Sequence, residues 1–310
     1  MLDNASKAFF HILARSSALR FVASRYGMRH DRAFARRFIA GETTAEAIAA
    51  ARAIEARGLT HTLDQLGESV TSLAEADAAM RSYLEVVQAV TAAGVIRNLS
   101  LKLTQLGLDV DRATAVDHLR RILEHADDFF IRIDMESSAY TQVTLDTFET
   151  LWEHGHHNIG VVLQADLYRT EADEERVSRL GGRVRLVKGA YREPKTVAYQ
   201  KKADVDAQFA TLTRRLLERG TYPAIATHDI NMIRVAKEHA ATLGLGKDAF
   251  EFQMLYGIRR DLQQSLLDEG YRVRVYVPFG TQWFPYFMRR LGERPANLLF
   301  LLRGLAADRG

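Results

Sequence analysis

Short apolar runs alternate with amphipathic stretches along most of the chain. After Gly58, eight runs of strand-like composition follow one another, each with a near-continuous apolar centre. They span residues 59–67, 96–103, 128–136, 158–166, 183–191, 222–229, 249–257 and 271–280. Apolar residues at helical spacing fill the segments between them, as in 72–92, 112–125, 171–180, 200–219 and 230–241. The pattern therefore predicts eight strand–helix units.

Eight such units in a chain of 310 residues favour a (β/α)8 TIM-type barrel, of class α/β. The alternative is a doubly wound sheet, which usually carries a glycine-rich phosphate-binding turn after its first strand. Neither GxGxxG nor GxxxxGK[ST] occurs in the chain. Residues 1–55 have a helical pattern with Gly41 as a break. We therefore predict an N-terminal helical arm over 1–55 and a catalytic barrel with a C-terminal helix over 56–310.

The composition narrows the class of protein. Hydrophobic residues make up 47% and charged residues 26%, which is typical of a globular protein with a substantial core. Because the chain has no cysteine, disulfides, thiolate metal sites and cysteine nucleophiles are excluded. No run approaches the roughly 20 apolar residues of a membrane span, and the first residues lack the order of a signal peptide. We expect a cytoplasmic protein.

The net charge of +3 comes from arginines that are spread along the chain. A nucleic-acid-binding protein would instead gather basic residues on one face, together with aromatic residues. We therefore expect no nucleic-acid partner.

Polar side chains gather where the predicted strands end, which is where barrel enzymes place their chemistry. They are Glu68, Lys102, Asp134, Glu136, Gln164, Asp166, Arg185, Lys188, Tyr191, Thr227, His228, Asp229, Gln253 and Tyr276. Beyond the eighth strand, PYFMRRLGE places Tyr286, Arg289, Arg290 and Glu293 on one stripe of a helix. Lysine and arginine are rarely buried without partners, so a shared cavity would pair these charges internally or hold an anionic ligand.

Each of these residues alone has an ordinary structural explanation. A single Asp or Lys at a strand end is as often part of a stabilising ion pair, and the Arg289–Arg290 pair alone is more often a surface feature. The run HGHH (154–157) suggests a metal site, but it precedes the fourth strand, on the face that serves stability. We interpret it as a solvated loop and predict no metal site. Because many polar residues gather at one mouth of the predicted barrel, a functional site explains them better than separate structural roles.

The sequence also contains motifs that identify a family resemblance. They are LDQLGE, SLKLTQLG, IRIDMES, VVLQA, RVRLVKGAYREP, ATHD, FEFQMLYGI, YVPFG and YFMRRLGERPANLLF. In this order the chain resembles the monofunctional bacterial proline dehydrogenases, FAD enzymes that begin proline breakdown. The resemblance covers residues 59–303, and RLVKGAY, FQMLYG and YxxRR together are its most specific part. It implies a distorted (β/α)8 barrel.

The resemblance implies a substrate pocket for L-proline. Arg289 and Arg290 would bind the substrate carboxylate, because guanidinium groups offer paired donors in a fixed plane, and Lys102 would add a third cation. Asp134 would balance the charge of these cationic groups. Glu68 would pair with Arg289 when the site is closed. The residues implied around the pyrrolidine ring and the arginine end of the pocket are Tyr191, Leu255, Tyr276 and Tyr286.

The resemblance likewise implies a non-covalent FAD site. Its residues would be Gln164, Arg185, Val187, Lys188, Gly189, Ala190, Arg192, Thr227, His228, Gln253 and Glu293. A glycine at position 189 would let the backbone approach a flat ring or a phosphate closely. One departure from the family pattern is Asp166, which stands where an aromatic residue usually follows the Gln-Ala pair.

The reaction that the resemblance implies is oxidation of L-proline to 1-pyrroline-5-carboxylate, by hydride transfer from proline C5 to flavin N5. It is the first step of proline catabolism to glutamate. The implied partners are a quinone-type electron acceptor, which would bring the protein into peripheral contact with the inner face of the cell membrane, and 1-pyrroline-5-carboxylate dehydrogenase.

Other classes of protein remain open from the residues themselves. A Schiff-base lyase or aldolase-type barrel could use Lys188 or Lys102 as its nucleophile. A metal-dependent hydrolase is less favoured, because no pair of strand-end histidines has suitable spacing. A non-catalytic amino-acid-binding barrel would keep the pocket without the cofactor. Flavin absorption of the purified protein separates these alternatives.

Overall fold

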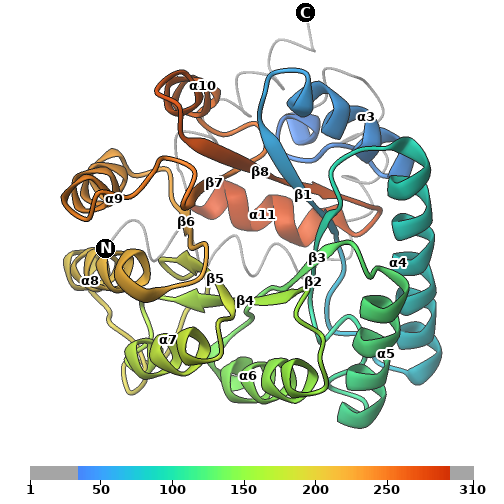
Figure 1. Cartoon of the computed structure of the whole chain (residues 1–310). Helices are drawn as coiled ribbons and strands as arrows, with labels where there is room; N and C mark the ends of the chain where they lie inside the picture. The colour runs from blue at the N-terminus through green and yellow to red at the C-terminus, as the bar shows by residue number, and fades with distance from the viewer. Residues whose placement is uncertain (1–33, 294–310) are drawn as a thin grey trace, which may run out of the picture.

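Eight parallel strands close into a barrel in which each strand pairs with the next and β8 pairs with β1 (Figure 1). The computed structural model of the chain describes residues 34–293, and the side chains from 35 to 290. The strands are β1 (Thr60–Gln65), β2 (Asn98–Leu101), β3 (Phe130–Ile133), β4 (Ile159–Gln164), β5 (Arg183–Val187), β6 (Ala224–Ala226), β7 (Glu251–Leu255) and β8 (Arg272–Phe279). Each lies within a predicted strand segment, and the predicted (β/α)8 fold is confirmed.

Helices form the outer layer of the barrel. After the 3-10 turn η1 (Phe34–Arg37) they are α3 (Thr44–Glu55), α4 (Leu73–Ala93), α5 (Arg112–His125), α6 (Ser138–Glu153), α7 (Thr170–Arg179), α8 (Lys202–Arg219), α9 (Ile230–Thr242), α10 (Arg260–Asp268) and α11 (Trp283–Glu293). The five helical windows named from the sequence match α4, α5, α7, α8 and α9 to within two residues at each end. Residues 1–33 of the predicted arm and 294–310 at the C-terminal end lie outside the described part.

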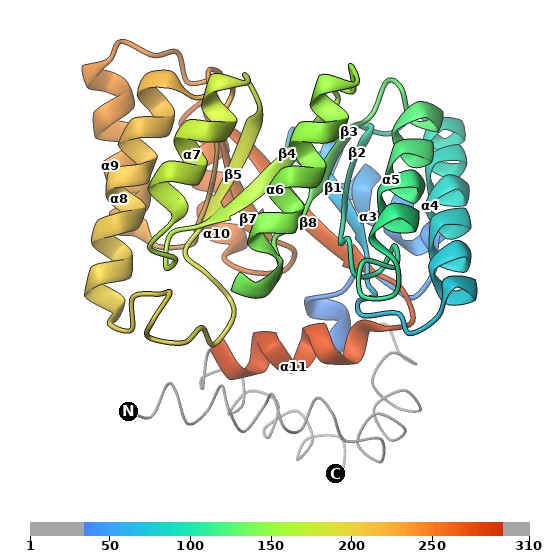
Figure 2. The same cartoon turned by 90° about the horizontal axis from the view of Figure 1, so that it is seen from below.

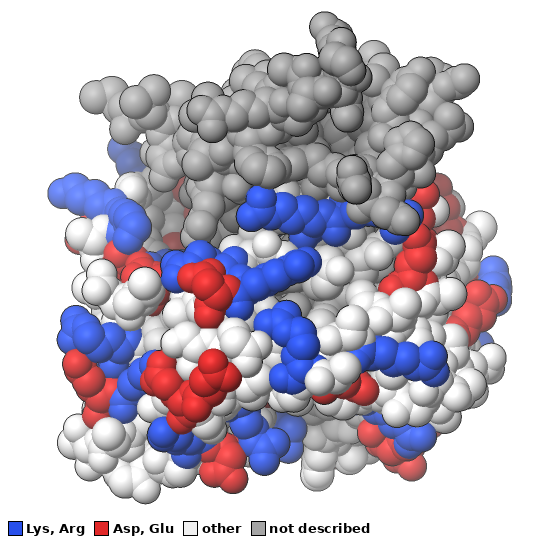
Figure 3. All heavy atoms as spheres, turned by 90° about the horizontal axis from the view of Figure 1, so that it is seen from above, with Lys and Arg blue, Asp and Glu red and all other residues white. Residues whose placement is uncertain are grey.

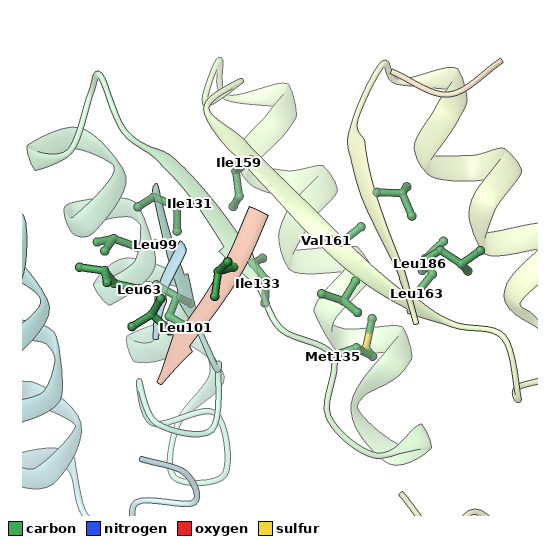
Figure 4. Close-up of a cluster of buried hydrophobic side chains, with 14 of the residues drawn as sticks. Leu63, Leu99, Leu101, Ile131, Ile133, Met135, Ile159, Val161, Leu163 and Leu186 are labelled. Atoms are coloured by element: carbon green, nitrogen blue, oxygen red, sulfur yellow. The ribbon is translucent and has the colours of Figure 1, made fainter. Parts of the chain in front are cut away.

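The apolar core lies between the strands and these helices. Leu63, Leu99, Ile131 and Ile159 are register partners on four adjacent strands, and each is at most 1% exposed. Figure 4 shows these side chains in one cluster with their neighbours. Successive side chains of a strand point to opposite faces, so the residues between them face the barrel interior.

The inward positions are largely polar, against the expectation that both faces of each strand are apolar. Arg185 on β5 donates from Nη2 to Ser100 Oγ on β2 at 3.0 Å. These strands are not neighbours, so the bond crosses the barrel interior. Arg132, Glu251 and Gln253 are also polar and buried. An eight-stranded barrel is just wide enough for side chains to fill, and a long guanidinium group can join strands across it.

The helix that follows β8 lies across the mouth of the barrel rather than beside it. Figure 2 shows α11 spanning the end of the barrel at which the strands finish. Instead, α3 packs against β1, β8 and α4, in the position beside the β8–β1 seam. The fold is therefore a distorted TIM barrel. Although α3 falls within the predicted arm, it forms part of the barrel wall.

A second apolar cluster fastens α11 to the segment before α3. Phe38, Ile39, Leu66, Trp283 and Phe287 all belong to this cluster and are buried. The rings of Phe38 and Phe287 are 6.3 Å apart between centroids. The segment is itself held by a capping box at the start of α3, in which Thr43 and Glu46 exchange side-chain to backbone hydrogen bonds. Residues from both ends of the described chain thus close the mouth.

The outer surface has two features that bear on partners. Among the described residues, no helix combines the length and apolar character needed to cross a membrane. On the flank that Figure 3 shows, positive and negative side chains interleave. That face therefore carries no broad field of one sign, of the kind that nucleic acid binding requires.

A buried histidine joins α3 to the barrel. His61 in β1 is 0% exposed, and its Nε2 lies 2.9 Å from Glu55 Oε1, at the end of α3. Its Nδ1 has no hydrogen-bond partner within the described residues. Burial lowers the pKa of His61, although the carboxylate of Glu55 opposes this effect; the positive charge of Arg274 lowers it further. A proton added at Nδ1 would thus be an unpartnered buried charge.

We predict that His61 makes the protein less stable at acid pH. Because the pKa of His61 is lower in the folded state than the value of about 6.5 expected when unfolded, unfolding takes up a proton below that pH. The free energy of unfolding should therefore fall as pH is lowered from 7 through the window below about 6.5. Urea unfolding at pH 7 and at a pH below about 6.5 measures this fall in the free energy of unfolding. The fall should be smaller for His61→Gln than for the unmodified chain. His125→Gln, at an exposed histidine of α5, is the matched control and should keep the full pH dependence. Equal slopes in all three proteins would contradict this role of His61.

Candidate active site

A cavity of about 520 Å³ opens at the carboxyl ends of the strands, under α11. Its wall contains most of the residues predicted from the sequence: Lys102, Asp134, Gln164, Arg185, Val187, Lys188, Gly189, Ala190, Tyr191, Thr227, His228, Gln253, Leu255, Tyr276, Tyr286, Arg289 and Arg290. They come from seven of the eight strand ends and from α11. The strand-end argument therefore located the cavity.

Five predicted residues are not part of this wall: the strand-end residues Glu136 and Asp166, and three residues assigned to the substrate or flavin site. Glu68 lines a small adjoining cavity, beside Lys102 and Arg289. Arg192 is exposed and does not line the cavity. Glu293 is the last residue of α11, and its side chain lies outside the described part.

Arg185 forms the floor of the cavity. It donates from Nη1 to Asp134 Oδ1 at 2.6 Å, from Nε to Gln253 Oε1 at 2.5 Å, and from Nη2 to Ser100. Its guanidinium carbon lies 5.3 Å from the ring centroid of Tyr276. All of these partners come from different strands or strand ends, so one side chain fixes the floor. Charge-assisted hydrogen bonds of this kind are among the stronger ones in proteins.

Tyr276 stands over this floor. Its hydroxyl donates to Asp134 Oδ2 at 2.8 Å, so Asp134 binds Arg185 through one oxygen and Tyr276 through the other. Burial raises the pKa of Tyr276 well above the ordinary value, and the charges of Asp134 and Asp64 add to the effect. Tyr276 therefore keeps its proton and presents a neutral ring to the cavity.

Lys102 is held from behind by Asp64. Its Nζ lies 3.4 Å and 3.5 Å from the two carboxylate oxygens of Asp64, which is fully buried in β1. Burial alone would lower the pKa of Lys102, but the charges of Asp64 and Asp134 outweigh it and raise the pKa. Lys102 is therefore a permanent cation in the wall of the cavity.

Two further cations come from α11. Arg289 donates from Nη1 to Glu68 Oε1 at 2.9 Å. Burial would lower the pKa of Arg289, but the charge and hydrogen bond of Glu68 raise it. The guanidinium carbon of Arg290 lies 5.2 Å from the ring centroid of Tyr286. Tyr191 faces the same end, and burial raises its pKa to about 12 despite the opposing charges of Arg289 and Lys102. This end combines positive charge with aromatic rings.

The opposite end of the cavity contains a second polar group. Lys188 Nζ donates to Asp229 Oδ2 at 2.7 Å and also to Asp206. His228 accepts at Nε2 from the backbone N–H of Leu255 at 3.0 Å. That bond requires Nε2 to be unprotonated, which fixes the tautomer of the neutral ring. The end therefore offers hydrogen-bond donors and acceptors in fixed directions.

Between the two ends, the wall at Gly189 is bare backbone. Gly189 has φ +121°, and a Cβ there would lie 2.0 Å from Asp166 Oδ2. Asp166 cannot easily retreat, because its own N–H and C=O are bonded to Lys188 O and Tyr199 N at 2.9 Å and 2.8 Å. Glycine is thus required at this position, and Asp166 occupies the space behind it.

Sequence reasoning missed several residues of the site. Asp64 was not singled out, although a polar residue inside an apolar strand is a signal, and a buried Lys102 requires a carboxylate. Asp229 was noted at its strand end but given no role. The apolar lining residues that were missed are Met135, Val162, Ala226 and Met254. Nothing in their residue type separates them from core positions.

The surroundings of the two lysines and of the histidines bear on the Schiff-base and metal-dependent alternatives. A Schiff-base lysine must become a neutral amine, usually through a lowered pKa. Lys102 has a raised pKa, and Lys188 is paired with two carboxylates, so neither is set up for that role. Within the described residues, no three His, Asp or Glu side chains form a group that could hold a metal. The HGHH run bonds locally, with His154 Nδ1 at 2.6 Å from Thr150 O.

Comparisons with known proteins agree on one family. The model of the family "Proline dehydrogenase" matches residues 47–303. The chain is similar to a proline dehydrogenase of Deinococcus radiodurans, with 44% identity over 87% of this chain and 89% of the relative. It is also similar to proline dehydrogenase 1 of Bacillus subtilis strain 168, with 41% identity over 96% and 97% of the two chains.

Solved structures give the same fold. The structure of proline utilization A from Bdellovibrio bacteriovorus, inactivated by N-propargylglycine, has a TM-score of 0.78 and 28% identity to this chain. The match covers 83% of this chain but only 32% of that longer protein. The likeness therefore concerns one part of a larger polypeptide.

We predict that Gly189→Ala destabilises the protein more than a glycine substitution in open space. Gly155 is the matched control, because it also has a positive φ, of +90°, but a Cβ there meets nothing within 4 Å. Gly155→Ala should cost about 1–2 kcal/mol from backbone strain alone. Gly189→Ala should cost that and the displacement of Asp166, so its total should be roughly twice as large. Unfolding by urea measures both, and equal losses would show that Asp166 moves aside freely.

Proposed function

Because the chain belongs to the proline dehydrogenase family, we propose that it oxidises L-proline to 1-pyrroline-5-carboxylate, with FAD as a non-covalent cofactor. The observation that carries the proposal is the end of the cavity at which Lys102, Arg289 and Arg290 meet aromatic rings. A small zwitterion with an apolar ring and a carboxylate needs that combination. Proline catabolism to glutamate begins with this oxidation.

The cations bind the substrate carboxylate. Arg289 and Arg290 are successive residues of α11, so their guanidinium groups reach the cavity from different directions around the helix. Lys102 approaches from β2, on the other side. Together they would fix both oxygens of a carboxylate and so orient the ring attached to it.

The ring of the substrate would lie against apolar and aromatic side chains. Leu255, Tyr191, Tyr276 and Tyr286 all line the cavity. Tyr276 cannot swing away without breaking its bond to Asp134 and its stacking on Arg185. The pocket is therefore rigid on the side where it would exclude larger substrate rings by steric clash.

The residues present fit a flavin. The cavity is far larger than a substrate the size of proline requires, and at Gly189 its wall leaves bare backbone for close approach to a flat ring. Hydrogen-bonding groups around this wall would hold the ring system and its phosphate-bearing tail: Gln164, Arg185, Lys188, Thr227, His228 and Gln253. Val187 and Ala190 would add apolar contacts. The bound flavin supplies the acceptor for the hydride that leaves proline C5.

The chain's own part in the reaction is binding, orientation and charge. Proline must lose the proton of its secondary amine before the hydride can leave. Cations near the bound amine lower its pKa, so Lys102, Arg289 and Arg290 would favour the neutral amine. The oxidation rate should therefore rise with pH as the amine deprotonates.

Closure of the site would depend on α11. The Arg289–Glu68 pair joins this helix to the loop after β1, across the small cavity that Lys102 also lines. We assign Glu68 the role of a gate partner, since breaking this pair would free Arg289 and open the mouth. The closed pair excludes water from the substrate end.

We propose a quinone-type electron acceptor, reached by peripheral contact with the inner face of the cell membrane from the cytoplasm. The product imine would pass to 1-pyrroline-5-carboxylate dehydrogenase. A flavin-linked oxidation needs an acceptor to regenerate the cofactor, and an unstable cyclic imine needs an enzyme that consumes it.

Purification with observation of the visible spectrum tests the proposal. The protein should be yellow, and L-proline should bleach the flavin absorption without oxygen. A colourless protein that traps a carbonyl substrate with borohydride would favour the Schiff-base alternative. A colourless protein that binds proline unchanged would favour a non-catalytic barrel.

We predict that Arg289→Met and Arg290→Met each raise KM for proline by roughly 10- to 100-fold, with a smaller change in kcat. This is the loss of one charge-assisted hydrogen bond to the ground-state carboxylate, about 1.5–3 kcal/mol. Arg234→Met is the matched control, because Arg234 is exposed on the outer helix α9 and lies outside the cavity wall. Steady-state kinetics should show that this control variant has the same KM for proline as the unmodified enzyme. An unchanged KM in either α11 variant would remove that arginine from the carboxylate site.

We also predict that Tyr276 discriminates by size. Its fixed ring would crowd C4 of the substrate, so 4-hydroxyproline should have a lower kcat/KM than proline. Tyr276→Ser opens that space and should narrow the gap, by an order of magnitude or roughly so, as expected for one added group in a tight pocket. Comparable kcat/KM values for both substrates in the unmodified enzyme would reject this role of Tyr276.

A further inference from the structure

One carboxylate lies directly behind the substrate end of the cavity without lining it. Asp64 in β1 is 0% exposed, and both of its oxygens lie within 3.5 Å of Lys102 Nζ. We propose that Asp64 is a positioning residue for substrate binding, which holds the ammonium group of Lys102 toward the substrate carboxylate. This inference rests on the proposed function, since it assumes a carboxylate ligand at Lys102.

The strand register places Asp64 beneath Lys102. Asp64 pairs with Ser100 on β2, and Ser100 faces the interior because it bonds Arg185. Lys102 is two residues beyond Ser100, so its side chain leaves the same face one level closer to the mouth. Asp64 can therefore reach Lys102 only from below, which leaves the upper side of the ammonium group toward the cavity.

The other carboxylates near Lys102 are bonded elsewhere. Asp134 accepts from Arg185 and Tyr276, and Glu68 accepts from Arg289. Among the described carboxylates, Asp64 is the one to which Lys102 itself is bonded. A buried ammonium group without a partner is costly, so Asp64 permits Lys102 to be a cation at this depth.

The distances suit a ligand that binds later. An ammonium has three donors, and close charge-assisted bonds measure about 2.7–2.9 Å. Lys102 is 3.4 Å and 3.5 Å from the two oxygens of Asp64, a shared and longer contact. A donor thus remains for a substrate carboxylate, while the direction of the side chain is already set. Tyr276, the neighbour of both Asp64 and Asp134, ties the same carboxylates to the ring side of the pocket.

A double-mutant cycle separates this role from a purely structural ion pair. It uses the holoenzyme, Asp64→Asn, Lys102→Met and the double variant. The readouts are KM and kcat for proline and the Kd of tetrahydrofuran-2-carboxylate, a ring carboxylate without an oxidisable amine, measured by calorimetry. We expect Asp64→Asn to raise KM and Kd by about tenfold with a smaller change in kcat. In the Lys102→Met background it should add less than about twofold, because the two residues act as one unit.

Two controls guard against effects of stability alone. Glu174→Gln removes a buried carboxylate that pairs with Arg215 and Arg219 on the outer helices, and it should leave KM and Kd unchanged. If Asp64→Asn does not fold, Asp64→Glu takes its place. It keeps the charge but displaces the carboxylate by one methylene, and it should still weaken Kd while retaining the flavin.

The outcomes are distinct. Equal effects of Asp64→Asn in both backgrounds, or no effect on Kd in either, would overturn the positioning role. If neither proline nor the carboxylate analogue binds the unmodified protein, the proposed function fails instead. Binding of the analogue together with an additive cycle leaves the function intact and removes Asp64 from it.

Discussion

One guanidinium group inside the barrel joins parts of the chain that share no strand pairing. Arg185 bonds Ser100, Asp134 and Gln253, so β2, the end of β3 and β7 meet at a single side chain. A buried polar group that loses its partner costs about 1–3 kcal/mol, and removal of Arg185 would take a partner from two buried groups, Ser100 and Gln253, and from the carboxylate of Asp134. The floor of the cavity, the direction of Asp134 and the position of Tyr276 all depend on this crossing.

The site above that floor is organised before any ligand binds. Lys102 is held by Asp64, Arg289 by Glu68, and Tyr276 by Asp134, so each of these three groups has its own support in the chain. Because these side chains are already held in place, ligand binding needs to order fewer of them and loses less conformational entropy. It also balances the charges of Lys102 and Arg289 with two carboxylates outside the wall of the main cavity, Asp64 and Glu68, which leaves room for an anionic group to enter.

The sequence predicts the barrel and most of the cavity wall because both follow from local pattern. Alternating strand and helix periods define the units, and the rule that chemistry lies at strand ends gathers Lys102, Lys188 and Gln253 without any knowledge of contacts. Residues whose role depends on the alignment of neighbouring strands are harder to predict from the sequence. Asp64 contributes only through its alignment with Ser100. The exchange of roles between α3 and α11 also has no local signal, since both have ordinary amphipathic patterns.

The position of α11 across the mouth of the barrel has a consequence for the order in which the protein folds. The apolar residues of this helix, such as Trp283 and Phe287, are among the last described residues to be synthesised, yet they pack in one cluster with Phe38 near the beginning of the described chain. Contacts so distant in sequence form late and slowly, because the chain between them must be ordered first. A nascent chain on the ribosome can form neighbouring strands one after another, but α11 cannot cover the cavity before residues 283–293 have been synthesised. The wall of the cavity is therefore complete only after α11 has packed on the segment before α3.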